Sequence, residues 1–77
     1  MIVPVQSEVG SQLVDTIKTS GIESIKSAEV TAISSTENFI NTIYTVTTKN
    51  NQNQIQTVVI SVSPKQQPKI VQVHSQK

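Results

Sequence analysis

The spacing of apolar side chains along the chain changes once, after Gly21. Between Ser7 and Gly21, apolar residues recur three or four positions apart, which is the spacing of one face of a helix. Beyond Gly21, apolar and polar residues alternate, which is the period of a β-strand. The pattern therefore predicts one helix followed by a series of strands, with a short apolar segment over residues 1–6 in front of the helix.

The predicted helix covers residues 8–20 and is the only one that the pattern favours. Ser7 is a good residue to cap its N-terminus, and Gly21 is placed to end it. Gly10 lowers the intrinsic stability of this helix by about 1 kcal/mol relative to alanine. The apolar stripe that is expected to cover the sheet consists of Val9, Leu13, Val14 and Ile17.

Four strands are predicted over residues 27–35, 39–49, 54–63 and 69–75. Short turn-forming segments separate them, so strands next to each other in sequence are expected to pair antiparallel. Two faces are assigned by alternation: in the first strand Ala28, Val30 and Ala32 share one face and Ile33 lies on the other, and in the last strand Val71 and Val73 share a face.

Residues 1–6 are extended in character, because Pro4 disfavours a helical conformation at Val3. They form either a short edge strand or a mobile arm. The predicted fold class is α+β, with one helix packed on a curled antiparallel meander of four to five strands. Residues 1–77 are expected to form a single domain, since a chain of this length has room for one core.

The composition agrees with a β-rich, weakly charged protein. Ten Ile and eleven Val stand against one Leu, and Ser, Thr, Asn and Gln make up 33 of the 77 residues. A net charge of +1 and the absence of arginine argue against binding to nucleic acid or to acidic membranes. The chain has no apolar run long enough to span a bilayer. Because its first residues include no basic region and no long apolar stretch, they are not expected to be a signal peptide. The compartment stays open, with the cytoplasm favoured.

Residues for catalysis are few. The chain has one histidine, His74, one aspartate, Asp15, and no cysteine, and its glutamates are scattered. A site that pairs His74 with a serine is formally possible, but a solvent-facing histidine on the last strand is the preferred interpretation. The sequence therefore predicts that the protein is not an enzyme and binds no cofactor and no metal ion.

The order of elements, together with three stretches of sequence, resembles the cystatin superfamily and within it the small, cysteine-free stefin type. The stretches are residues 1–8 (MIVPVQSE), residues 12–18 (QLVDTIK) and residues 63–73 (SPKQQPKIVQV). The resemblance implies an inhibitor of papain-like cysteine proteases, which inserts a wedge into the active-site cleft. The wedge combines an N-terminal arm with the first and second hairpins, and it acts by contact without a reactive group.

Carried over to this chain, the resemblance implies a partner-binding surface made of Ile2, Val3, Pro4, Glu37, Asn38, Phe39, Pro64 and Lys65. The first hairpin reads SSTENFI over residues 34–40 and lacks the Gln-x-Val-x-Gly motif of the family, and the arm lacks the family's glycine. Glu37 places a carboxylate in this hairpin, which costs about a few kcal/mol if it is buried in a complex without a partner.

Two other functions stay open. The low-charge, β-branched segments over residues 39–48 and 57–63 are also typical of a structural or assembly subunit that self-associates through strand edges or strand exchange and inhibits nothing. A carrier of a small apolar ligand is less favoured, because one helix on a short sheet encloses little volume.

Overall fold

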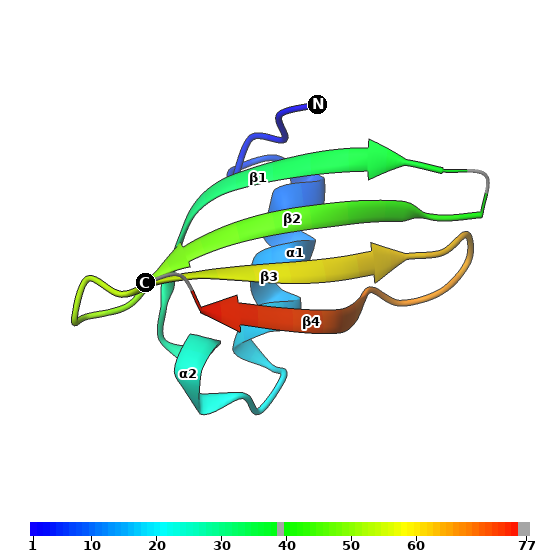
Figure 1. Cartoon of the computed structure of the whole chain (residues 1–77). Coiled ribbons are helices and arrows are strands. Elements are labelled where there is room, and N and C mark those ends of the chain that lie inside the picture. The colour runs from blue at the N-terminus through cyan, green and yellow to red at the C-terminus, as the bar shows by residue number, and fades with distance from the viewer. Residues whose placement is uncertain (39, 76–77) are drawn as a thin grey trace.

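The computed structural model describes residues 1–38 and 40–75. In the order of the sequence, the elements are α1 (Glu8–Lys18), α2 (Glu23–Lys26), β1 (Glu29–Glu37), β2 (Thr42–Lys49), β3 (Ile55–Val62) and β4 (Lys69–Ser75). The four strands form one antiparallel sheet in the order β1-β2-β3-β4 (Figure 1). The α+β class and the four-stranded antiparallel sheet are thus confirmed. In the part of the chain that is described, no helix has the length and apolar character needed to cross a bilayer.

Helix α1 begins as the sequence predicts. The side chain of Ser7 accepts a hydrogen bond from the backbone N–H of Gly10 at 3.1 Å, with Glu8 in the first turn. The helix ends at Lys18, two residues before the predicted end. The hydroxyls of Thr19 and Ser20 donate to carbonyls of the last turn, at 2.7 and 2.8 Å, and such local hydrogen bonds compete with continuation of the helix.

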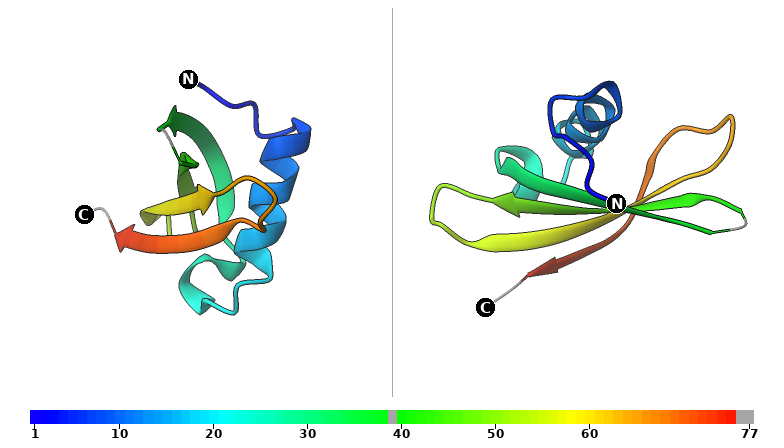
Figure 2. Two further views of the ribbon diagram at one scale, coloured as in Figure 1. Left: turned by 90° about the vertical axis from the view of Figure 1, so that its right-hand side faces the viewer. Right: turned by 90° about the horizontal axis from the view of Figure 1, so that it is seen from above.

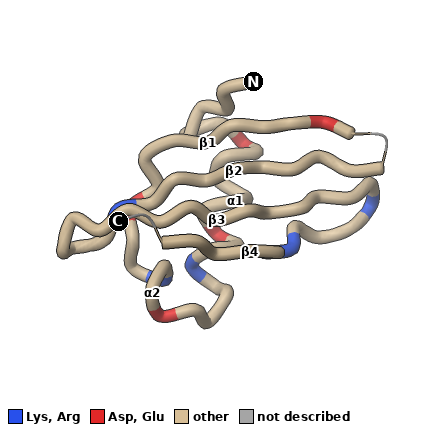
Figure 3. The backbone as a smooth tube through the Cα atoms, viewed as in Figure 1, with Lys and Arg blue, Asp and Glu red and all other residues tan. Residues whose placement is uncertain are grey.

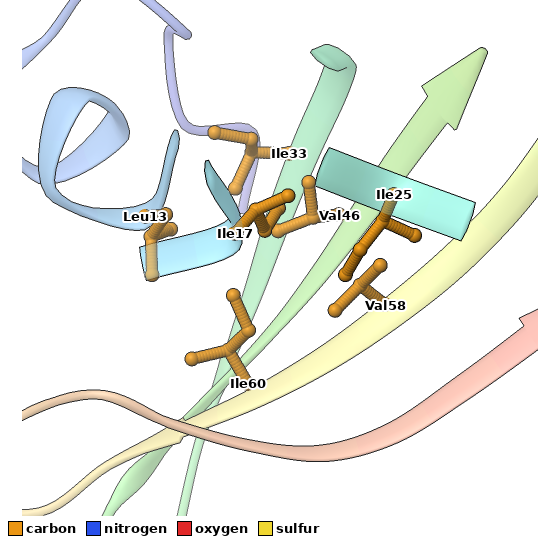
Figure 4. Packing of buried hydrophobic residues seen from close by; sticks show 7 residues of the cluster. All are labelled: Leu13, Ile17, Ile25, Ile33, Val46, Val58 and Ile60. Carbon is orange, nitrogen blue, oxygen red and sulfur yellow. The ribbon is translucent and has the colours of Figure 1, made fainter. Parts of the chain in front are cut away.

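Both helices lie on the same face of the sheet (Figure 2), and the core fills the space between them and the strands. Its buried members are Leu13, Ile17, Ile25, Ile33, Val46, Val58 and Ile60 (Figure 4). The prediction for Leu13 and Ile17 is confirmed. Val9 is 39% exposed, because the row of buried residues along the helix consists of Gly10, Leu13 and Ile17 and does not include Val9. Helix α2 was not predicted, and it buries Ile25 completely.

A bulge in β1 reverses the predicted faces of this strand. The register with β2 shifts between Val30 and Ala32, and the hydroxyl of Thr31 donates to the carbonyl of Thr47 at 3.2 Å. Beyond the bulge, Ile33 lies in the core and is 2% exposed, while Ala32 is exposed. The prediction that Ala32 shares the face of Val30 and that Ile33 lies opposite is therefore wrong, because one extra residue changes the side of every position that follows.

A second irregularity lies between β3 and β4. Val59 pairs with Gln72 and Ile60 pairs with Ile70, so that Val71 has no partner of its own in this register. Val71 is 53% exposed, whereas Ile70 and Val73 pack against the core. The expectation that Val71 and Val73 share a face is wrong for the same physical reason as in β1.

Residues 1–3 pair with the outer edge of β1. Ile2 forms an antiparallel bridge with Ser34, and the N–H of Val3 donates to the carbonyl of Ile33 at 2.9 Å. Of the two alternatives for this segment, the structure contains the edge pairing. The four predicted strands are present, and the largest difference in bounds is at the start of β2, which begins at Thr42 and not at residue 39.

Candidate protein-binding site

The β1–β2 hairpin and the β3–β4 hairpin emerge at the same end of the sheet, and the β2–β3 turn lies at the opposite end (Figure 1). A cavity of about 350 Å³ lies between the two hairpins. It is lined by Glu37, Asn38, Ile40, Asn41, Thr42, Val62, Ser63 and Pro64. We call this set the hairpin cavity. Of the residues that the sequence singled out for partner binding, the cavity brings together Glu37, Asn38 and Pro64.

The first hairpin is held by the side chain of Asn38. Its Oδ1 accepts hydrogen bonds from the backbone N–H groups of Ile40 at 2.9 Å and Asn41 at 2.7 Å. The N–H of Asn38 in turn donates to the carbonyl of Asn41 at 3.0 Å. An asparagine side chain can order a turn in this way without a glycine. Glu37, the last residue of β1, is exposed. Phe39 was proposed from sequence and lies outside the described residues.

The second hairpin contains a tight turn over residues 63–66, in which the N–H of Gln66 donates to the carbonyl of Ser63 at 3.1 Å. Pro64 follows Ser63, and Lys65 has a φ of +64°, which together match a type II turn. The left-handed backbone of Lys65 is one that glycine or asparagine adopts more readily. Both Pro64 and Lys65 are exposed, but Lys65 does not line the hairpin cavity.

A side-chain hydrogen bond connects the bases of the two hairpins. The Nδ2 of Asn41, just before β2, donates to the Oγ of Ser61, near the end of β3, at 2.9 Å. Neither residue was proposed from sequence, nor were Ile40, Thr42 and Val62. The length of the β2–β3 turn is the feature of the sequence that could have identified Thr42 and Val62. If the turn places Lys49 opposite Ile55, the antiparallel pairing places Thr42 opposite Val62.

The N-terminal segment runs along the outer edge of β1 toward this end of the sheet and pairs as far as Ser35, two residues before β1 ends at Glu37. The terminal ammonium of Met1 donates to the carbonyl of Ser35 at 3.0 Å, and the N–H of Ser35 donates to the carbonyl of Met1 at 2.8 Å. Ile2 is 85% exposed and Pro4 is exposed, so both are available to a partner. Val3 packs against the core and is less available.

The charges at this end are sparse. Figure 3 shows an acidic position at the end of β1 and basic positions in the β3–β4 connection and at the start of β4. Within residues 1–38 and 40–75, no three histidine or carboxylate side chains lie close enough together to hold a metal ion. His74 is exposed on β4.

No protein-family model, curated protein or solved structure matches this chain.

Proposed function

We propose that the chain is a non-catalytic protein-binding module that inhibits papain-like cysteine proteases in the manner of a stefin. The observation that supports this proposal is the meeting of the first and second hairpins at one cavity, with the N-terminal segment along the neighbouring edge of β1. Glu37 and Asn38 of the first hairpin and Pro64 of the second line one cavity, and residues 1–3 run along β1 as far as Ser35. The proposal includes a cystatin-like fold, with the sheet curled around α1.

Two exposed isoleucines supply apolar contact area in this proposal. Ile2 is 85% exposed and Ile40 is 76% exposed, and the two belong to the arm and the first hairpin. Full burial of an isoleucine side chain against a partner is worth about 1.5–3 kcal/mol. The first hairpin lacks the family's motif, so other residues must provide its contacts. In this proposal Ile40 makes the apolar contact with the protease, and the hydrogen bonds of Asn38 keep the hairpin rigid.

Inhibition of papain and of a cathepsin-type protease by the purified chain tests the proposal. We expect inhibition at micromolar or lower concentration, because contact at three segments buries several apolar side chains. Ile40→Asp should weaken inhibition at least about tenfold, since it removes apolar area and adds a charge to a dry interface. The matched control is Ile55→Asp, because Ile55 is also exposed but begins β3 at the other end of the sheet. Full protease activity at micromolar wild-type chain would end the proposal.

A second candidate function is self-assembly, and the edge strand β4 favours it. Strand β4 has one neighbour, β3, in the described sheet, and Val71 is exposed on it. An exposed strand edge can pair with another copy of the chain. Light scattering over a hundredfold dilution tests this function, with Val71→Lys as the variant that should reduce the mass. A mass of one protomer at every concentration would remove it.

A further inference from the structure

Three of the residues that line the hairpin cavity form a row that crosses the sheet. Glu37 of β1 pairs with Thr42 of β2, which in turn pairs with Val62 of β3. Strand β4 does not extend to this row, because its first residue, Lys69, pairs with Ser61. At about 4.8 Å per strand the row spans about 10 Å, which is enough for one long side chain to lie across it.

The lining combines one charge with polar and apolar surface. Among the described residues that line it, Glu37 is the only ionisable one, and Ile40, Val62 and Pro64 supply the apolar part. In the part of the chain that the structure describes, Glu37 forms no ion pair. A side chain that fits this lining has an aliphatic stem and a positive end, because the stem can cover the apolar residues while the end pairs with the carboxylate.

We propose that the hairpin cavity receives a basic side chain of the protein partner, with arginine preferred to lysine. Arginine is preferred because its planar guanidinium can donate two hydrogen bonds to one carboxylate. The inference rests on the proposed function, and there it identifies the target as a papain-like protease with a basic residue on the rim of its cleft. The proposed arginine would also neutralise Glu37. In the family, the motif of the first hairpin has no charged residue at its fixed positions.

Other occupants fit the lining less well. Lys65 and Lys69 lie at this end of the sheet but do not line the cavity, so the charge that an acidic side chain would meet inside it is that of Glu37, which would repel it. A purely apolar side chain would remove water from the carboxylate without replacing its hydrogen bonds. A divalent cation needs several oxygen ligands, and the lining provides one carboxylate.

The test uses a blocked tripeptide, acetyl-Gly-Arg-Gly-amide, titrated into the ¹⁵N-labelled full chain and followed by NMR. The matched peptide contains citrulline, which has the shape of arginine without its charge. The variants are Glu37→Gln and, as control, Glu29→Gln, which makes the same change at the other end of β1. The spectra of both variants also report whether the fold is intact.

We expect saturable shifts of the backbone signals of residues 37, 38, 40–42, 62 and 63 and of the side-chain amide of Asn41. The affinity should fall about two- to fivefold for the citrulline peptide and for Glu37→Gln, as for one partly exposed charge pair, and stay unchanged for Glu29→Gln. Equal affinity for both peptides, equal binding by Glu37→Gln, or shifts located elsewhere would overturn the inference.

Protease assays separate this inference from the proposed function. If the arginine peptide binds as expected but papain stays active, the cavity accepts a basic side chain and the inhibitor proposal is wrong. If the chain inhibits papain and Glu37→Gln inhibits equally well, the inhibitor proposal stands and the role of Glu37 is overturned.

Discussion

Asn41 and Ser61 lie twenty residues apart in sequence and are joined by a hydrogen bond of 2.9 Å from Nδ2 to Oγ. The bond connects the base of the first hairpin to the strand that leads into the second. Both side chains are partly buried, so the bond is protected from competing water. It therefore helps to fix the distance between the two hairpins, and with it the shape of the cavity between them.

The first prediction concerns this bond. Asn41→Ala and Ser61→Ala should each lower the free energy of unfolding by about 1 kcal/mol, and the double variant should lose less than the sum, because the shared bond is lost only once. Urea denaturation of the four proteins measures the coupling, which we expect to be about 0.5–1 kcal/mol. Additive losses would show that the bond does not contribute in solution.

The second prediction concerns Gly10, which is buried in α1. A Cβ atom at this position would lie closer than 3.0 Å to the backbone carbonyl oxygens of Pro4 and Val5. Gly10→Ala should therefore destabilise the fold by about 1–3 kcal/mol, even though alanine favours a helix by about 1 kcal/mol. Thermal and urea unfolding measure the change.

Ser11→Ala is the control for this variant, because Ser11 is the next residue of the helix and is exposed. We expect its stability to be unchanged or slightly raised. If Gly10→Ala were as stable as Ser11→Ala, the carbonyl groups of Pro4 and Val5 would not lie against the helix in solution.

The third prediction concerns the second hairpin. Lys65→Gly should raise the free energy of unfolding by about 0.5–1 kcal/mol, because glycine adopts the φ of +64° without the steric cost that lysine has there. Gln67→Gly is the control and should be destabilising, since Gln67 is not among the described residues with positive φ. A loss of stability in Lys65→Gly would contradict the turn geometry.

The fourth prediction tests the two strand irregularities together. Ile33→Ala should cost about 2–5 kcal/mol, since Ile33 is buried beyond the bulge in β1. Val71→Ala should cost less than about 1 kcal/mol, because Val71 is half exposed at the register shift in β4. Regular alternation along the strands would give the reverse order, and the midpoints of denaturant unfolding distinguish the two.

The sequence was informative where one local rule decided the structure. The Ser7 cap, the core positions of Leu13 and Ile17, and the four antiparallel strands follow from periodicity and turn residues, and all are present. The faces of the sheet on which Ile33 and Val71 lie could not be predicted in this way. The alternation of apolar and polar residues does not show where a strand contains an extra residue. Helix α2 has four residues, which is too short for a helical period to be visible.

The candidate site divides in the same way. Glu37, Asn38 and Pro64 were proposed from the family resemblance, and their position beside one another depends on the strand order, which the short turns predict. The bond between Asn41 and Ser61 depends on the register of β2 with β3 residue by residue. A shift of one residue would move both side chains to other neighbours, so hydrophobic patterning alone does not predict it.

Amide hydrogen exchange of the chain with and without papain tests most directly whether the hairpin end is the contact surface. Contact through this end predicts that papain slows exchange at the backbone amides of residues 2, 3, 37, 38, 40–42, 62, 63 and 65, and leaves the turn at residues 50–54 unchanged. Slower exchange confined to residues 50–54 or to β4, or no change at micromolar papain, would contradict it.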